Sequence, residues 1–193
     1  MTKLVLASSS QRRKEILSLL GFNFSIDKHK FNEPKVRFHN SPSKFVEKIA
    51  VEKAKSVAKF YKDKIIIAAD TIVVLNGKEI IGKPQDELDA QNILRKLSGT
   101  KHEVLSGLCL IYPKKKLLLS GVEKSIVFTR KLSETEIRKI SKKHLDKAGA
   151  YAVQEKKDRF VKKIIGDYYN VVGFPVFLFL KLYRELLIKI KKF

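Results

Sequence analysis

Hydrophobic positions near the start of the chain change from a short continuous run to a stripe of helical period. Residues 4–7 form an apolar run that predicts a strand. Ser10 is a suitable N-cap for the helix that follows, and Gly21 is a suitable end. Residues 22–26 can pair as a further short strand. The chain therefore opens as strand, helix, strand.

Prolines and a second helical stripe follow. The segment 31–42 contains Pro34 and Pro42 and predicts an exposed loop. Ser41 or Ser43 then starts a long helix that we expect to run through about Tyr61.

The middle of the chain is dominated by apolar runs of strand length. Residues 65–69 and 71–75 predict one buried strand interrupted only by Asp70, and Asn76-Gly77 is a strong two-residue hairpin turn into residues 79–81. A helix is expected from about Asp86 to Leu97, and it ends near Gly99.

Alternation of strands and helices continues in the second half. Residues 104–111 and 117–128 predict an antiparallel pair, and Ser133 with Glu136 forms a capping box for a helix to about Lys143. No linker, repeat or low-complexity break divides residues 1–193, so we expect one domain. The mixture of hairpins and helices predicts a mixed α/β (α+β) fold rather than a simple doubly wound sheet.

One apolar stretch, residues 171–180, raises the question of a membrane. It is about half the length needed to cross a bilayer and contains Gly173 and Pro175. Beyond Pro175 the apolar positions keep a helical period. We expect a terminal helix docked on the core, with a membrane-surface anchor as the alternative.

The single cysteine, Cys109, cannot form an internal disulfide, and its apolar neighbours predict a buried thiol. Residues 4–7 lack the flanks of a secretion signal. We therefore expect a cytoplasmic protein.

The formal net charge of +21 favours phosphate-rich partners. The lysines are nevertheless scattered in pairs and triplets, with no zinc-finger spacing, RNA-recognition motif or single basic arm. We therefore expect solvated surface charge and no specific nucleic acid, with non-specific nucleic-acid adhesion as the alternative.

The first strand and helix are joined by a segment suited to an anion. Ser8 to Ser10 precede Arg12 and Arg13, so hydroxyls and free amides at a helix N-terminus adjoin guanidinium groups. The plainer interpretation is a capping serine followed by solvated arginines.

Two charges break apolar patterns. Asp70 interrupts a buried strand, where an unpartnered carboxylate costs several kcal/mol. A metal ion, a cation or a catalytic water would relieve that cost, and so would a turn that it caps. Lys53 lies on the inward side of its helix with Val46, Val57 and Phe60. It can snorkel to solvent or meet a carboxylate.

Other candidates are individually weak. Glu33 lies in a loop and Lys83 precedes Pro84, and each alone is more often solvated. The four histidines show no zinc-ligand spacing, and no Walker loop or nucleophile elbow occurs. Acidic oxygens and cations favour magnesium-assisted phosphate chemistry over acyl transfer.

In this order and spacing, several short segments resemble the Maf-like nucleoside triphosphate pyrophosphatases nearly end to end. They are Leu6-Ala7-Ser8-Ser9-Ser10-Gln11-Arg12-Arg13, Phe31-Asn32-Glu33, Ala50-Val51-Glu52-Lys53-Ala54, Ala69-Asp70-Thr71, Gly82-Lys83-Pro84, Leu97-Ser98-Gly99, Lys147-Ala148-Gly149-Ala150-Tyr151-Ala152-Val153-Gln154 and Tyr169-Asn170-Val171-Val172-Gly173-Phe174-Pro175.

The resemblance implies a two-lobed, elongated mixed sheet flanked by helices, with a cleft between the lobes, often in a homodimer. It implies hydrolysis of a nucleoside triphosphate to the monophosphate and pyrophosphate. Asp70 matches the catalytic acidic residue, and Glu33 matches an acidic residue near a divalent metal, Mg²⁺ or Mn²⁺, that Asp70 also binds. The residues that match those around the triphosphate are Ser8, Ser10, Arg13, Lys53 and Lys83.

Three further positions separate substrate classes within the family. Here they are Arg12, Thr71 and Gln154, which resemble the branch that acts on dTTP and UTP. We therefore expect pyrimidine nucleotides, including modified ones, in nucleotide-pool house-cleaning. The alternatives are the branch that acts on 7-methyl-GTP, and a regulatory protein that senses nucleotide or binds nucleic acid without turnover.

Overall fold

Seven strands form one mixed sheet in this computed structural model, which describes residues 3–29, 31 and 41–192. The strand order is β2-β1-β3-β5-β6-β7, and β4 pairs with β3. Strand β1 is parallel to β2 and β3, and the other pairs are antiparallel. The strands are β1 (Leu4–Leu6), β2 (Phe24–Ile26), β3 (Ile65–Leu75), β4 (Glu79–Ile81), β5 (Lys101–Tyr112), β6 (Leu117–Thr129) and β7 (Val161–Ile165).

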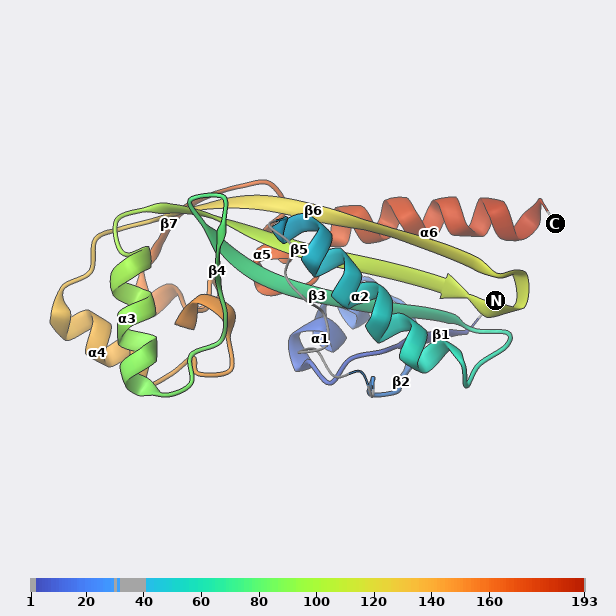
Figure 1. Cartoon of the computed structure of the whole chain (residues 1–193), viewed down its shortest axis with the longest axis horizontal. Helices are drawn as coiled ribbons and strands as arrows, with labels where there is room; N and C mark the ends of the chain where they lie inside the picture. Colours follow the sequence, from blue (N-terminus) through green and yellow to red (C-terminus); the bar gives the residue numbers. More distant parts are fainter. Residues whose placement is uncertain (1–2, 30, 32–40, 193) are drawn as a thin grey trace.

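Figure 1 shows an elongated, two-lobed molecule in which β3, β5 and β6 run through both lobes. Helices α3 and α4 lie in one lobe, and α1, α2 and α6 lie in the other. The helices are α1 (Gln11–Leu19), α2 (Pro42–Ala58), α3 (Glu87–Leu97), α4 (Glu134–Ser141), α5 (Tyr168–Val172) and α6 (Val176–Lys191), with short 3-10 turns η2 (Pro113–Lys115), η3 (Ala148–Ala150) and η4 (Lys156–Asp158). The expected mixed α/β fold is confirmed.

Successive residues of β3 face opposite sides of the sheet. Ile67 packs in a core with α1 and α6, and Val73, on the same face, packs in a second core with α3 and α4. Ile66 faces the other side, where it packs with α2. One long strand thus carries the cores of both lobes, and Asp70 and Thr71 lie at its middle.

Local signals in the sequence place most element boundaries. Asn76 and Gly77 both have positive φ, 51° and 72°, as a tight hairpin of this turn type requires. The capping box of Ser133 and Glu136 is present, and Ser10 caps α1 as expected.

Other expectations were wrong. Helix α2 ends at Ala58 rather than near Tyr61, and Phe60 is 58% exposed rather than inward. Helix α4 ends at Ser141, slightly before the expected end near Lys143. Strand β7 and helix α5 were not predicted. Most of the expected loop over residues 31–42 lies outside the described residues, and Pro42 begins α2.

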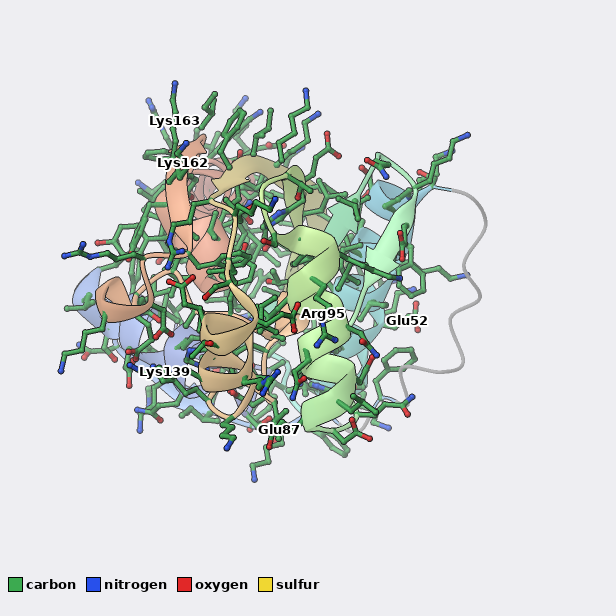
Figure 2. The ribbon with its side chains drawn as sticks, turned by 90° about the vertical axis from the view of Figure 1, so that its left-hand side faces the viewer. Glu52, Glu87, Arg95, Lys139, Lys162 and Lys163 are labelled. Carbon is green, nitrogen blue, oxygen red and sulfur yellow. The ribbon has the colours of Figure 1, made fainter. Side chains whose placement is uncertain are left out.

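The terminal helix docks as expected, since its apolar side packs against the α1 face of the sheet through Phe179, Leu182 and Leu186. Within the described ranges, no helix has the length and apolar character needed to cross a membrane. Surface charge comes from many elements, as Figure 2 shows for Glu52, Glu87, Arg95, Lys139, Lys162 and Lys163.

Candidate functional site

A cleft of about 770 Å³ lies where the two lobes meet at the middle of β3. That volume is within the usual range for small-molecule sites. Its walls come from the β1–α1 loop, α2, β3, the segment after β4, and the segment around η3. Of the ten residues expected at the site, nine line this cleft: Ser8, Ser10, Arg12, Arg13, Lys53, Asp70, Thr71, Lys83 and Gln154. Glu33 lies outside the described residues.

The loop between β1 and α1 is ordered by its own serines. Ser8 Oγ accepts a hydrogen bond from the Ser10 backbone N–H at 3.1 Å, and Ser10 Oγ accepts one from the Arg13 backbone N–H at 3.5 Å. The α1 N-terminus therefore opens toward the cleft with hydroxyl groups around it. Such an end attracts anions.

Arg13 is held in place by groups from distant parts of the chain. Its Nε donates to the Gly173 carbonyl at 3.0 Å, and its Nη1 and Nη2 donate to Ser8 Oγ and Thr71 Oγ1, both at 3.4 Å. Thr71 Oγ1 also lies 2.8 Å from Ser106 Oγ. Thr71 therefore helps to position the guanidinium from the floor of the cleft.

Asp70 and Lys53 meet across the other face of β3. Lys53 Nζ donates to Asp70 Oδ1 at 2.6 Å, and the two side chains are only 4% and 13% exposed. Lys53 thus points inward and meets a carboxylate, and a cation accompanies the Asp70 carboxylate.

Gly107 lets α2 come this close to the sheet. It pairs with Asp70 in the β3–β5 register. A Cβ at Gly107 would lie 2.3 Å from the Val46 backbone oxygen of α2, which no real side chain tolerates. The absent side chain thus permits α2 to pack close enough for Lys53 to reach Asp70.

The segment after β4 brings Lys83 to the opposite wall. The Gly82 carbonyl accepts a hydrogen bond from the Gly149 N–H at 3.1 Å, so this segment is tied to the η3 turn. Lys83 is exposed and lines the cleft. Gln154, a few residues beyond η3, is also exposed there.

Sequence reasoning did not place Asp146 at the site, although its carboxylate lines the cleft together with that of Asp70. Asp146 Oδ2 accepts from Arg12 Nη1 at 3.2 Å, and Asp146 Oδ1 accepts from Lys147 Nζ at 2.8 Å. Burial acts to raise the pKa of Asp146, but the two cations outweigh it, so this pKa lies below its ordinary value. The available signal was its position directly before the matched segment at residues 147–154.

The donor set suits a magnesium ion held largely by a substrate. Within the described residues, no three or more His, Cys, Asp or Glu side chains are grouped so that they could hold a metal ion. Asp70 supplies one carboxylate in the cleft, and Mg²⁺ in nucleotide enzymes is commonly held by one or two carboxylates, substrate phosphates and water. The residues present therefore fit an ion that arrives with a phosphate ligand.

Fold and site together define a two-lobed mixed α/β protein with a central cleft suited to a mononucleotide-sized polyanion. Among the described lining residues, cations outnumber carboxylates, and a helix N-terminus opens among them. The chain belongs to the Maf family, described as Maf-like protein, whose family model matches residues 3–186.

Curated relatives cover nearly the whole chain. A Clostridium botulinum (strain Eklund 17B / Type B) protein named dTTP/UTP pyrophosphatase is 48% identical over 178 residues, 90% of this chain and 94% of that protein. An Aquifex aeolicus (strain VF5) protein of the same name is 44% identical over 186 residues, 95% of each chain. A solved structure titled "The structure of the Staphylococcus aureus Ham1 protein" aligns with TM-score 0.43 and 19% identity, covering 67% of this chain and 71% of that chain.

Proposed function

We propose that this protein hydrolyses dTTP and UTP to the nucleoside monophosphate and pyrophosphate. The names of its relatives support this substrate class. The observation that carries the proposal is the Lys53–Asp70 pair, a nearly buried carboxylate in a cleft lined mainly by cations. Cleavage between the α- and β-phosphates needs one base for water and several cations for the leaving pyrophosphate.

Asp70 is the base in this proposal. The Lys53 ammonium orients the Asp70 carboxylate, so that a water beside Asp70 can lose a proton as it attacks the α-phosphorus. Catalytic chemistry of this kind depends on groups that are already in place before the reaction. The short Lys53 contact provides that preorganisation.

In this proposal, the cations that line the cleft face the departing pyrophosphate. Arg13, Lys83 and the α1 N-terminus stabilise the negative charge that develops on the bridging oxygen and the β-phosphate. Arg13 is fixed by Ser8, Thr71 and Gly173 and need not reorganise during the reaction.

We propose magnesium as the cofactor, with manganese as the alternative. Asp70 would hold the ion, and the sequence resemblance adds Glu33. A bound divalent cation neutralises phosphate charge and aligns the triphosphate. Hydrolysis without added divalent metal after chelation would contradict this assignment.

A homodimer and a cytoplasmic location belong to the same proposal. Exposed apolar side chains on β7, α5 and the start of α6 support a contact between two copies: Ile165, Tyr168, Phe177 and Leu180. Sedimentation of the wild type and Phe177→Asp measures this, and a monomeric wild type would contradict it.

The deciding experiment is pyrophosphate release from a panel of canonical and modified triphosphates with magnesium. Wild type should release pyrophosphate from dTTP and UTP, and Asp70→Asn should lose this activity by at least about 10²-fold while remaining folded. Asp63→Asn, at an exposed aspartate before β3, is the matched control. Preference for 7-methyl-GTP would overturn the substrate class. Nucleotide binding without turnover would favour the regulatory alternative.

A further inference from the structure

The cleft contains two acid–base pairs that differ in depth. Asp70 with Lys53 lies deep, at 13% and 4% exposed, whereas Asp146 is 64% exposed and pairs with Arg12, at 29%. Asp146 and Arg12 come from different lobes and are 134 positions apart in the chain. The proposed catalytic steps use the deep pair, and Asp146 of the outer pair has no role in them.

A substrate cleaved at its α-phosphorus has two arms that leave the reacting centre. One arm is pyrophosphate and the other is the nucleoside. A carboxylate repels pyrophosphate more than it repels an uncharged base, which favours the nucleoside as the arm that extends toward Asp146. The cations that suit pyrophosphate, Arg13 and Lys83, line the same cleft but make none of the hydrogen bonds to Asp146 that the structure shows.

Arg12 and Arg13 are neighbours on α1, yet they point to different partners. Arg13 turns to Ser8, Thr71 and Gly173, whereas Arg12 turns to Asp146 in the other lobe. Adjacent helical residues project about 100° apart. This divergence leaves two guanidinium groups from one helix N-terminus at different places in the cleft.

The outer pair presents one donor beside one acceptor. Arg12 has five N–H donors, and only its Nη1 makes a side-chain hydrogen bond within residues 3–29 and 41–192. Each Asp146 oxygen accepts one hydrogen bond and has a further lone pair. The two cations keep the pKa of Asp146 low. At neutral pH its carboxylate is therefore ionised and can accept hydrogen bonds but cannot donate one.

We propose that Asp146, acting with Arg12, reads the imide edge of a uracil or thymine base. Uracil and thymine place the O4 carbonyl oxygen beside the N3–H, and this pair matches a guanidinium donor beside a carboxylate acceptor. Cytosine held in the same register by its triphosphate presents an amino group and an unprotonated N3, which reverses both. This inference rests on the proposed pyrophosphatase function and adds Asp146 as a specificity residue.

The test compares kcat/KM for UTP, CTP and N3-methyl-UTP in the wild type, Asp146→Asn and Asp146→Glu. Wild type should prefer UTP to both other nucleotides. In Asp146→Asn, whose amide both donates and accepts, the UTP:CTP ratio should fall about 10- to 100-fold. Asp146→Glu should keep the preference for UTP because it keeps an ionised acceptor.

The matched control is Asp63→Asn, which removes one exposed negative charge outside the cleft and should leave every ratio unchanged. Equal losses for UTP and CTP in Asp146→Asn would assign Asp146 to the sugar or to contact between the lobes, and would overturn the inference. Efficient wild-type use of N3-methyl-UTP would also overturn it. A wild type that releases pyrophosphate from no triphosphate would instead refute the proposed function.

Discussion

Lys53 Nζ lies 2.6 Å from Asp70 Oδ1, and the two residues belong to different elements packed face to face. Neither charge would be stable at this depth alone, because removing one partner of a buried pair leaves an uncompensated charge. The same contact therefore stabilises the fold and prepares the proposed base.

We expect Lys53→Met to lower the free energy of unfolding by roughly 2–3 kcal/mol, since Asp70 would keep some access to water through the cleft. A double-mutant cycle with Asp70→Asn should give a coupling free energy of at least about 1 kcal/mol by denaturant unfolding. The exposed pair Lys96–Glu79 is the control and should couple by less than about 1 kcal/mol. Equal coupling in both cycles would contradict a special role for the deep pair.

Gly107→Ala should destabilise the protein by more than about 2 kcal/mol, because its Cβ would force α2 off the sheet at Val46. Pyrophosphatase activity should fall with it, as Lys53 moves away from Asp70. Gly121→Ala is the control: its Cβ would meet only the end of the Leu178 side chain at 3.3 Å, so the melting temperature should change little.

Lys83→Ala should reduce kcat by roughly 10²–10³-fold, the usual effect of removing one donor to developing charge. Circular dichroism should show an unchanged fold, because Lys83 is exposed. Lys78→Ala, in the neighbouring hairpin, should retain full activity. Normal turnover of Lys83→Ala would remove this residue from the mechanism.

Burial lowers the pKa of His102 from 6.5 to about 4, and its Nε2 lies 2.8 Å from the Tyr151 hydroxyl. Between these two pH values the unfolded chain takes up a proton that the folded chain does not. Stability is therefore present above pH 6.5 and lost as pH falls toward 4, by about 3 kcal/mol. In the double variant His102→Phe/Tyr151→Phe, the free energy of unfolding measured in urea should lack this part of the pH dependence. The same pH dependence as in the wild type would show that another group titrates in this range.

Cys109 is fully buried beneath α2, and burial raises the pKa of its thiol to about 12. A thiol reagent in mildly alkaline buffer should therefore leave the native protein unlabelled and react fully in denaturant. Rapid labelling of the native protein would mean that α2 opens readily from the sheet.

Local chemistry in the sequence determined much of the fold. Asn76-Gly77 can form only a narrow set of turns, and the Ser133–Glu136 box needs no distant partner, so these features were predictable. Element boundaries were less predictable: α2 ends at Ala58, and Phe60 just beyond it is 58% exposed. The short strand β7, with adjacent lysines, lacks a clear period and owes its state to pairing with β6.

At the site, the sequence supplied the residue types and the tertiary structure supplied their partners. Asp70 in an apolar strand and Lys53 on an inward helix face each signalled a missing counter-charge, but neither pattern could name the other residue. Only the packing of α2 on the sheet across Gly107 decided that pairing. Asp146 directly precedes the matched segment 147–154, but an exposed aspartate costs nothing by itself, so its position did not assign it a partner. The fold decides its partner, because it brings Arg12 to Asp146 across the cleft.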